Sequence, residues 1–396
     1  MHTMKLTRYN KLSVLKRIGP ILLDRFFKHF ETELNRHGLP LPPPDLPADE
    51  YFKRLAHLLN HPDKLPNALN EVLAALEDVA RPEAQDLLIT LPNWSQLVEK
   101  FDRDSTYEEI ALQLWLFAPN LLVRASNTQR LKRLTAFEHA GRSPKFKAPS
   151  RALVDPASIL PPLTTSLDAW FSLNDRGEDT TRIELYPMGG EFWFLIRHGD
   201  RYSRTPAVRS RTTEMMLFRP ERDDVVVLSP ELDELRINAR TKGERDLYIR
   251  KFGLHLRGSE EYFARLPTYT LDPLREAGAD ALDPNGFEGI IRIKLRELEI
   301  WFEEHRTITR APGCLFEMAS RHLGESPIPR QGELRRAIFE IHFTGSAKPR
   351  PVEIRLPNTL KLGRRCDARL VQSYFSIRGF RRNPSCPDTA GGPNGS

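Results

Sequence analysis

The first 140 residues carry apolar positions at the spacing of amphipathic helices. Between residues 21 and 34, apolar side chains recur every three or four positions, which places them on one helix face. Four further segments show the same spacing: 49–59, 66–79, 105–116 and 121–140. Ser105 and Glu108 have the spacing of a capping box at a helix start. With no alternation of period two, the pattern predicts an all-α domain over residues 1–140.

The pattern changes after a proline-rich stretch. Residues 141–162 contain five prolines and few large apolar side chains, which predicts a linker. A short helix is expected over residues 163–173 and another over residues 242–252. Between them lie strand-sized runs at 182–187, 191–198, 214–218, 224–228 and 234–239. Because these runs are adjacent in sequence, they predict an α+β domain over residues 163–272 with an antiparallel or mixed sheet.

The last third of the chain repeats this mixed style. Strands are expected at 289–300, 335–343 and 352–356, and helices at 314–323 and 366–377. These segments predict a second α+β region over residues 273–380, followed by a disordered tail over residues 381–396 that is rich in Pro, Gly and Ser. The predicted fold class is therefore a multidomain chain with an all-α N-terminal domain followed by an α+β region.

Composition narrows the class of protein. The chain has 396 residues, of which 40% are apolar and 28% charged, enough to bury a core. No window approaches the roughly 18 apolar residues that a membrane-spanning helix needs, and the first 17 residues lack the apolar run of a signal peptide. Cys314, Cys366 and Cys386 show no metal-ligand spacing, and three cysteines fit a reducing compartment. We predict a cytoplasmic protein without a membrane partner.

Positive charge is concentrated in two places. The chain carries 59 Lys and Arg against 53 Asp and Glu, but residues 321–382 alone hold 14 basic and five acidic residues. Residues 197–222 hold seven arginines against three acids, with Tyr202 among them. Arginine makes forked hydrogen bonds to phosphate, and concentrated basic regions attract polyanions. We therefore predict contacts with a nucleic-acid backbone from Arg197, Arg201, Arg204, Arg209, Arg211, Arg335, Arg336, Arg364, Arg365 and Arg369.

Residues 223–252 resemble the core of restriction-endonuclease-like nucleases. They predict a strand that opens with two aspartates, the second being Asp224, then a turn, a second strand and a helix. The resemblance implies that Asp224 binds Mg²⁺ together with a Glu-x-Lys motif on the second strand. This chain has Asn238 and Arg240 there, with Lys242 close behind. Asparagine is neutral and arginine does not deprotonate, so the resemblance implies an altered or degenerate nuclease site built from these four residues.

A second, shorter resemblance lies at the end of a predicted strand. Arg197, His198 and Gly199 resemble the phosphohistidine motif of histidine phosphatases, in which the histidine is the nucleophile and the arginine holds the phosphate. In that family the motif opens the domain, whereas about 190 residues precede it here. A strand end with a solvated arginine and histidine is the alternative.

Three functions follow from these patterns. The first is a protein that binds the backbone of DNA or RNA, largely without regard to sequence. The second is a metal-dependent nuclease, or a degenerate nuclease-like subunit, that would use Mg²⁺. The third is a protein-interaction scaffold whose helical domain binds a partner and whose basic residues are only a solvated surface, as in a charged, exposed β-hairpin.

Overall fold

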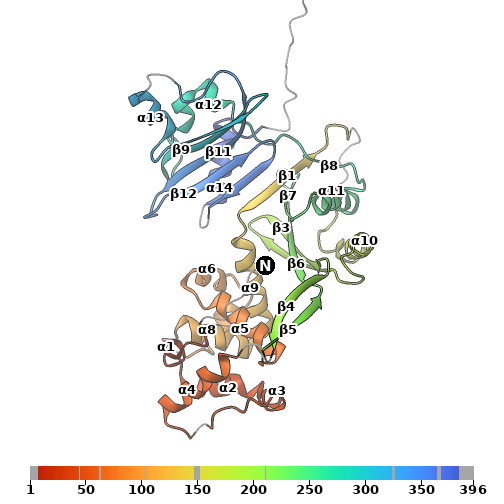
Figure 1. Ribbon diagram of the computed structural model, residues 1–396, viewed down its shortest axis with the longest axis vertical. Helices are drawn as coiled ribbons and strands as arrows, with labels where there is room; N and C mark the ends of the chain where they lie inside the picture. The colour runs from red at the N-terminus through yellow and green to blue at the C-terminus, as the bar shows by residue number, and fades with distance from the viewer. Residues whose placement is uncertain are drawn as a thin grey trace, which may run out of the picture. The chain divides into compact units, whose positions relative to one another are not determined.

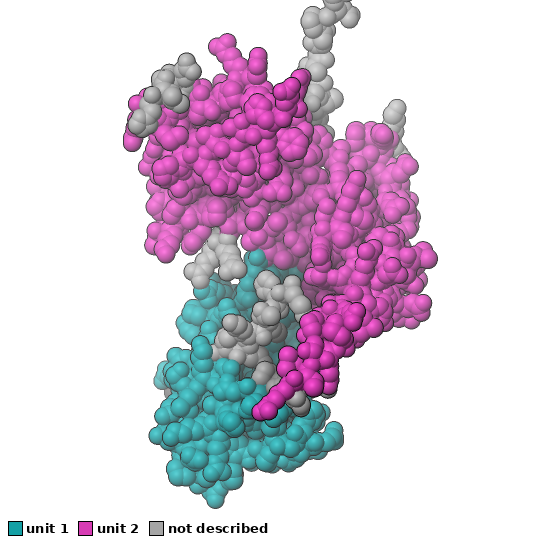
Figure 2. Space-filling model, viewed as in Figure 1, with its two compact units in different colours: residues 1–133 teal, residues 134–396 magenta. Residues whose placement is uncertain are grey.

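The computed structural model describes residues 8–43, 45–61, 64–102, 104–146, 152–209, 211–322, 326–363 and 367–382. It forms two compact units, residues 1–133 and residues 134–396 (Figure 2). Among the residues with a sequence prediction, Arg364, Arg365, Cys366, Cys386 and the tail from residue 383 lie outside the described parts.

The N-terminal unit is helical (Figure 1). Its helices are α1 (Leu12–Leu15), α2 (Pro20–Lys28), α3 (Glu31–Arg36), α4 (Ala48–Leu59), α5 (Asn67–Val79), the 3₁₀ turn η1 (Pro82–Ala84), α6 (Gln85–Leu88), α7 (Trp94–Val98), α8 (Tyr107–Phe117) and α9 (Pro119–Lys132). The apolar stripes predicted from the sequence meet in one core, in which Phe26, Leu55, Leu76 and Leu112 are fully buried. The helical prediction is thus confirmed for this unit.

The start of α8 lies one residue later than predicted. Thr106 is the N-cap, and its side chain accepts a hydrogen bond from the backbone N–H of Glu109. The carboxylate of Glu109 in turn accepts a hydrogen bond from the backbone N–H of Thr106. Ser105, the predicted cap, instead donates from its hydroxyl to the carbonyl oxygen of Asp102. Two overlapping capping signatures occur in the sequence, and the second forms.

The predicted last helix of this region is too long. Helix α9 ends at Lys132, and Ala136–Arg142 forms strand β1, which pairs with strands from much later in the chain. The boundary predicted at residue 140 therefore falls inside a strand of the C-terminal unit. Local sequence favoured a helix here, but pairing on both sides of β1 decides the outcome.

The C-terminal unit is an α+β fold (Figure 1). Its strands are β1, β2 (Arg182–Met188), β3 (Glu191–Gly199), β4 (Ser203–Arg209), β5 (Thr212–Phe218), β6 (Glu221–Ser229), β7 (Glu234–Asn238), β8 (Phe263–Ala264), β9 (Ile290–Trp301), β10 (Arg306–Arg310), β11 (Glu333–Phe343), β12 (Arg350–Arg355) and β13 (Thr359–Leu362). Its helices are α10 (Leu160–Leu173), α11 (Lys242–Arg257), α12 (Pro273–Glu276), the 3₁₀ turn η2 (Gly278–Leu282), α13 (Leu315–His322) and α14 (Ala368–Ile377).

One antiparallel sheet runs through this unit. Its strand order is β10-β9-β11-β12-β13-β1-β7-β6-β3-β2, with β8 beside β1, and every pairing among its described strands is antiparallel. The two α+β regions predicted from the sequence are the two halves of this sheet. Each half has its own core, one centred on Phe194 and Phe252 and the other on Phe339 and Phe375, and β1 joins them.

Side-chain alternation in the β3–β6–β7 half decides which residues enter its core. Ile196 of β3 lies opposite Asp224 of β6, and Phe194 lies opposite Val226. Directly opposite residues share a face of the sheet. This face carries the core against which α10 and α11 pack, so His198, two residues beyond Ile196, lies on the same covered face.

Strands β4 and β5, which follow β3 and precede β6 along the chain, form a separate two-stranded ribbon (Figure 1). Most of its described side chains are exposed, including Val208 at 79% and Leu217 at 68%. The sequence predicted β5 but not β4, because Pro206 and the surrounding arginines interrupt the apolar alternation. The ribbon is the exposed, charged hairpin that the sequence offered as one alternative for this segment.

Candidate functional site

The four residues of the predicted nuclease site do not converge. Asn238 of β7 lies opposite Val225, the neighbour of Asp224. Because side chains alternate between the faces of a strand, Asn238 and Asp224 point to opposite faces of the sheet. Asn238 donates from Nδ2 to the carbonyl oxygen of Ala136 at 2.6 Å. The structure therefore does not bring Asp224 and Asn238 together at one metal ion.

Arg240 and Lys242 both face solvent. The Arg240 side chain is 68% exposed, and its Nη1 lies 3.4 Å from Oδ2 of Asp200. Lys242 is the exposed first residue of α11. Asp224 instead has His198 and Tyr248 as hydrogen-bond partners, so the basic residues predicted to assist it do not do so.

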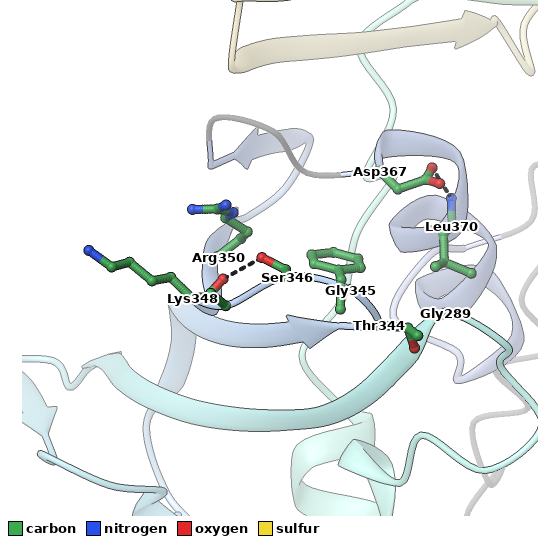
Figure 3. Close-up of a pocket in the computed structure, with 10 residues that line it drawn as sticks. Gly289, Thr344, Gly345, Ser346, Lys348, Arg350, Asp367 and Leu370 are labelled. Carbon is green, nitrogen blue, oxygen red and sulfur yellow. Dashed lines mark hydrogen bonds between the residues drawn. The ribbon is translucent and has the colours of Figure 1, made fainter. Parts of the chain in front are cut away.

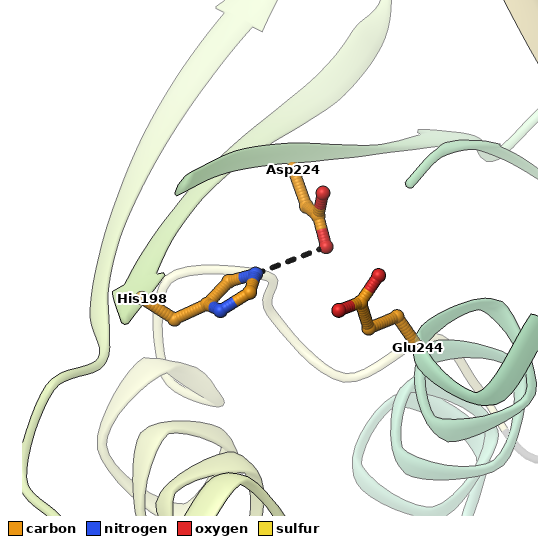
Figure 4. Close-up of side chains that lie close together, drawn as sticks. All are labelled: His198, Asp224 and Glu244. Carbon is orange, nitrogen blue, oxygen red and sulfur yellow. Dashed lines mark hydrogen bonds and ion pairs between the residues drawn. The ribbon is translucent and has the colours of Figure 1, made fainter. Parts of the chain in front are cut away.

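A different set of side chains surrounds Asp224 (Figure 4). His198 at the end of β3, Asp224 on β6 and Glu244 in the first turn of α11 each offer one nitrogen or oxygen atom, and these atoms lie within 4.8 Å of one another. We call these three residues the His198 cluster. They are 1%, 4% and 2% exposed, respectively. In the part of the chain that the structure describes, no other group of three His, Cys, Asp or Glu side chains has this spacing.

Local structure explains how Glu244 reaches the cluster. Thr241 is the N-cap of α11, and Glu244 occupies the third helical position of a capping box. The carboxylate of Glu244 accepts from the N–H of Thr241 at 2.9 Å, which folds the side chain back over the helix start. A carboxylate is favourable there because the N-terminus of a helix carries partial positive charge.

The imidazole of His198 is held in one orientation. Its Nδ1 lies 2.8 Å from the carbonyl oxygen of Gly199, and since a carbonyl only accepts, Nδ1 carries a proton. The ring of Phe171 stacks on the imidazole with centroids 4.1 Å apart and planes 11° apart. The other ring nitrogen, Nε2, therefore points at Oδ2 of Asp224, 3.2 Å away.

Both carboxylates of the cluster have further partners. The Tyr248 hydroxyl donates to Oδ2 of Asp224 at 2.8 Å. Arg176 donates from Nη2 to Oε1 of Glu244 at 2.8 Å and forms an ion pair with Asp200. The result is a buried network that links β3, β6, α11 and the loop after α10.

Burial and the neighbouring charges shift the pKa values of this network. Burial raises the pKa of Asp224 above its ordinary value. Burial alone would lower the pKa of His198, but the hydrogen bond to Asp224 and the charge of that carboxylate outweigh it, so the pKa of His198 is raised. When neither His198 Nε2 nor Asp224 Oδ2 carries a proton, both atoms can only accept a hydrogen bond. A proton or a cation must therefore lie between them.

The sequence patterns pointed to only part of this cluster. Asp224 was predicted as a metal ligand, and His198 was noted in the resemblance to histidine phosphatases. Arg197, the partner that this resemblance requires, points to the opposite face and pairs with Glu184 at 2.5 Å and Asp223 at 3.3 Å. Glu244 was missed, although the spacing of Thr241 and Glu244 is that of a capping box.

Four of the arginines predicted to contact nucleic acid are occupied within the protein. Arg197 is paired as just described, and Arg336 pairs with Glu297 and with Glu353. Arg335 lies 2.7 Å from Glu333 and stacks over a tryptophan, and Arg369 donates to the carbonyl oxygen of Gly189. Arg364, Arg365 and the side chain of Arg209 lie outside the described residues. The remaining three, Arg201, Arg204 and Arg211, belong to the β4–β5 hairpin or flank it.

These three hairpin arginines differ from Arg197, Arg335 and Arg336, which pair with carboxylates. Arg201, Arg204 and Arg211 are exposed, and within the described residues none of their guanidinium groups forms an ion pair. Tyr202 lies between the first two, is 64% exposed, and has the guanidinium of Arg219 4.3 Å from its ring centroid. The hairpin thus presents positive charge and an aromatic ring on one exposed ribbon.

A pocket of about 690 Å³ lies beside the turn between β11 and β12 (Figure 3). Lys348 and Arg350 extend from one side of it, and Asp367 lies on the other. Ser346 donates to the carbonyl oxygen of Lys348 at 2.8 Å, and Asp367 caps α14 by accepting from the N–H of Leu370 at 3.0 Å. These polar groups serve the turn and the helix cap, and they do not converge on a common point.

No protein-family model matches the chain, and no curated protein matches its sequence. In the described part of the chain, no helix combines the length and apolar character that crossing a membrane requires.

Proposed function

We propose that the protein binds the sugar–phosphate backbone of a nucleic acid through the β4–β5 hairpin. One observation supports this most directly. Arg201, Arg204 and Arg211 are exposed without a carboxylate partner among the described residues, whereas Arg197, Arg335 and Arg336 are paired. A guanidinium that no internal acid neutralises remains available for forked hydrogen bonds to phosphate oxygens.

The dimensions of the hairpin suit this role. Strand β4 has seven residues, which at about 3.3 Å per residue extend about 20 Å. Arg201 and Arg204 lie near its base and Arg211 in the turn at its tip, so they would reach phosphates several nucleotides apart. Tyr202 supplies an exposed ring on which a base can stack. Such contacts read the backbone and carry little sequence information.

Hydrolysis is not part of this proposal. Asp224 is 4% exposed and lies under α10 and α11, so a phosphodiester does not reach it in this conformation. The hairpin contains no carboxylate cluster that would hold Mg²⁺ among its described residues. The observations therefore favour binding over cleavage.

Fluorescence polarisation with labelled single-stranded DNA, duplex DNA and RNA tests the proposal. We expect the full chain to bind at about 50 mM salt and to lose most of its affinity at about 200 mM. Substituting Arg201, Arg204 and Arg211 together by Ala should weaken binding and reduce the slope of log affinity against log salt by about 2 to 3, since each phosphate contact contributes about 0.7 to 0.9.

A matched variant controls for net charge. Arg54, Arg292 and Arg306 are also exposed, but each pairs with a glutamate. Substituting these three by Ala changes the net charge equally and should leave the affinity almost unchanged. Equal weakening by both triple variants would show that total charge, not the hairpin, governs binding.

Absence of binding by the unmodified chain at about 50 mM salt would refute the proposal. The exposed apolar side chains Val208, Met215 and Leu217 of the same hairpin would then favour the scaffold alternative, in which this ribbon contacts a protein.

A further inference from the structure

We infer that the His198 cluster is a binding site for a transition-metal dication, with Zn²⁺ the best match, and that this ion ties β3, β6 and α11 together. This inference is independent of the hairpin and of nucleic-acid binding. It rests on the arrangement of three donor atoms, on their chemical types and on the charge balance around them.

The donor atoms have a spacing close to that of a metal site. Zn²⁺ binds imidazole nitrogen and carboxylate oxygen at about 2.0–2.2 Å in a tetrahedron, so neighbouring donor atoms are separated by about 3.3 Å. His198 Nε2 and Asp224 Oδ2 are 3.2 Å apart. Glu244 offers an oxygen within 4.8 Å of both, and this carboxylate would have to move toward the other two donors to complete three corners of the tetrahedron.

The donor types favour a transition metal over Mg²⁺ or Ca²⁺. Imidazole nitrogen suits zinc and its neighbours, whereas Mg²⁺ and Ca²⁺ prefer ligand sets made only of oxygen. His198 is oriented as metal-binding histidines usually are, with Nδ1 donating to the carbonyl of Gly199 and Nε2 directed into the cluster.

Neighbouring side chains would hold the ligands without blocking the ion. Tyr248 donates to Asp224, and Arg176 donates to Glu244. Each carboxylate oxygen has two lone pairs, so Oε1 of Glu244 can accept from Arg176 and still bind a metal. Such partners of the ligands are a regular feature of metal sites.

The charge balance leaves room for a cation. Asp200, Asp224 and Glu244 are buried, and Arg176 is the buried guanidinium that faces two of them. Arg222 and Arg240 approach only Asp200 and are more exposed. With His198 neutral, as a metal ligand must be, the carboxylates of the cluster exceed the buried positive charge next to them, and uncompensated buried charges are costly.

A shared proton between His198 and Asp224 is the competing occupant, and Asp224→Asn separates the two. His198 Nε2 and the Tyr248 hydroxyl both contact Oδ2 of Asp224, so the amide of the variant keeps at most one of these hydrogen bonds. Stability falls for either occupant, and the affinity for Zn²⁺ is what separates them. A metal site would lose a charged ligand, and its affinity for Zn²⁺ should fall at least tenfold, as for other losses at metal sites.

The experiment measures metal content of the full chain without an affinity tag. A background His57→Ala substitution removes the exposed pair of His57 and His61, whose rings are 5.1 Å apart and which would bind zinc at the surface. After incubation with Zn²⁺ and gel filtration, elemental analysis should find about one Zn²⁺ per chain. Chelation should lower the melting temperature, and Zn²⁺ but not Mg²⁺ should restore it.

A second buried imidazole–carboxylate pair supplies the control. His139 Nδ1 lies 3.0 Å from Glu234, but its Nε2 faces the Tyr269 hydroxyl at 3.2 Å, so Glu234→Gln should leave zinc content unchanged. The inference fails if the unmodified chain retains no zinc, or if Asp224→Asn retains as much as the unmodified chain. The first outcome does not depend on whether the variant folds.

Discussion

Glu234 is a single buried carboxylate that joins the two halves of the sheet. It lies on β7, 6% exposed, with His139 of β1 on one oxygen and Arg381 from beyond α14 on the other. Arg381 also forms a β-bridge with Tyr269, so this residue, predicted as the first of a disordered tail, is part of the fold. Burial lowers the pKa of His139.

The pKa of Glu234 makes stability depend on pH. Burial alone would raise it, but His139, Arg381 and Arg236 outweigh burial and lower the pKa from 4.5 to about 2. A lowered carboxylate pKa adds stability above the unfolded value and loses it as pH falls toward the folded value, here about 3 kcal/mol at neutral pH.

Urea unfolding of the unmodified chain and of Glu234→Gln measures this contribution. We expect the variant to be less stable by about 3 kcal/mol at pH 7, and the difference to shrink as the pH falls below about 4.5. Glu288→Gln, at an exposed carboxylate, should show no such difference. A difference for Glu234→Gln that is constant with pH would contradict the assigned charge state.

At the scale of elements, two helices begin with the same capping box, but only one of the two capping glutamates belongs to a buried polar network. Thr106 caps α8 and Thr241 caps α11, each in a capping box with a glutamate. Losing an N-cap costs about 1 kcal/mol, which we expect for Thr106→Ala. Thr241→Ala should cost more, about 2 kcal/mol, because Glu244 also belongs to the buried network. Urea unfolding of both variants checks this, and equal costs would show that Glu244 is held without its cap.

The individual strands and helices also show which features can be predicted from the sequence and which cannot. The strands at 191–198 and 224–228 were predicted because strand-sized apolar runs are a local signal. Strand β1 was missed because its partners, β7 and β13, lie about 100 and 220 residues further on. The His198 cluster was missed as a unit for the same reason, since three separate elements must pair before its members meet.

At the scale of the whole molecule, arginine charge is balanced across long distances in sequence. Residues 321–382 hold a large basic surplus, yet several of their arginines pair with acids from earlier segments. Arg378 pairs with Asp283, Arg381 with Glu234 and Arg382 with Asp272. A charge count by segment therefore does not distinguish paired from unpaired arginines, and the contact surface that we propose lies on the hairpin.

Arg336 can test whether a paired arginine of this region stabilises the fold or binds nucleic acid. It was predicted to contact nucleic acid, but its guanidinium pairs with Glu297 and, at 2.6 Å, with Glu353, and its side chain is only 18% exposed. Removing Arg336 leaves Glu297 and Glu353 only the more exposed Arg310 and Arg355, and breaking a largely buried ion pair costs about 3 kcal/mol. We expect Arg336→Ala to lower the free energy of unfolding by about this amount and to leave nucleic-acid affinity unchanged.

Arg355 is the matched control for this variant. It pairs with the same Glu353 at 2.9 Å, but its side chain is 62% exposed. Exposed ion pairs contribute at most about 1 kcal/mol, so Arg355→Ala should have a small effect on stability. If Arg336→Ala instead kept its stability and weakened binding in the polarisation assay, Arg336 would be a nucleic-acid contact. A guanidinium engaged only with internal carboxylates would contribute to stability and not to binding.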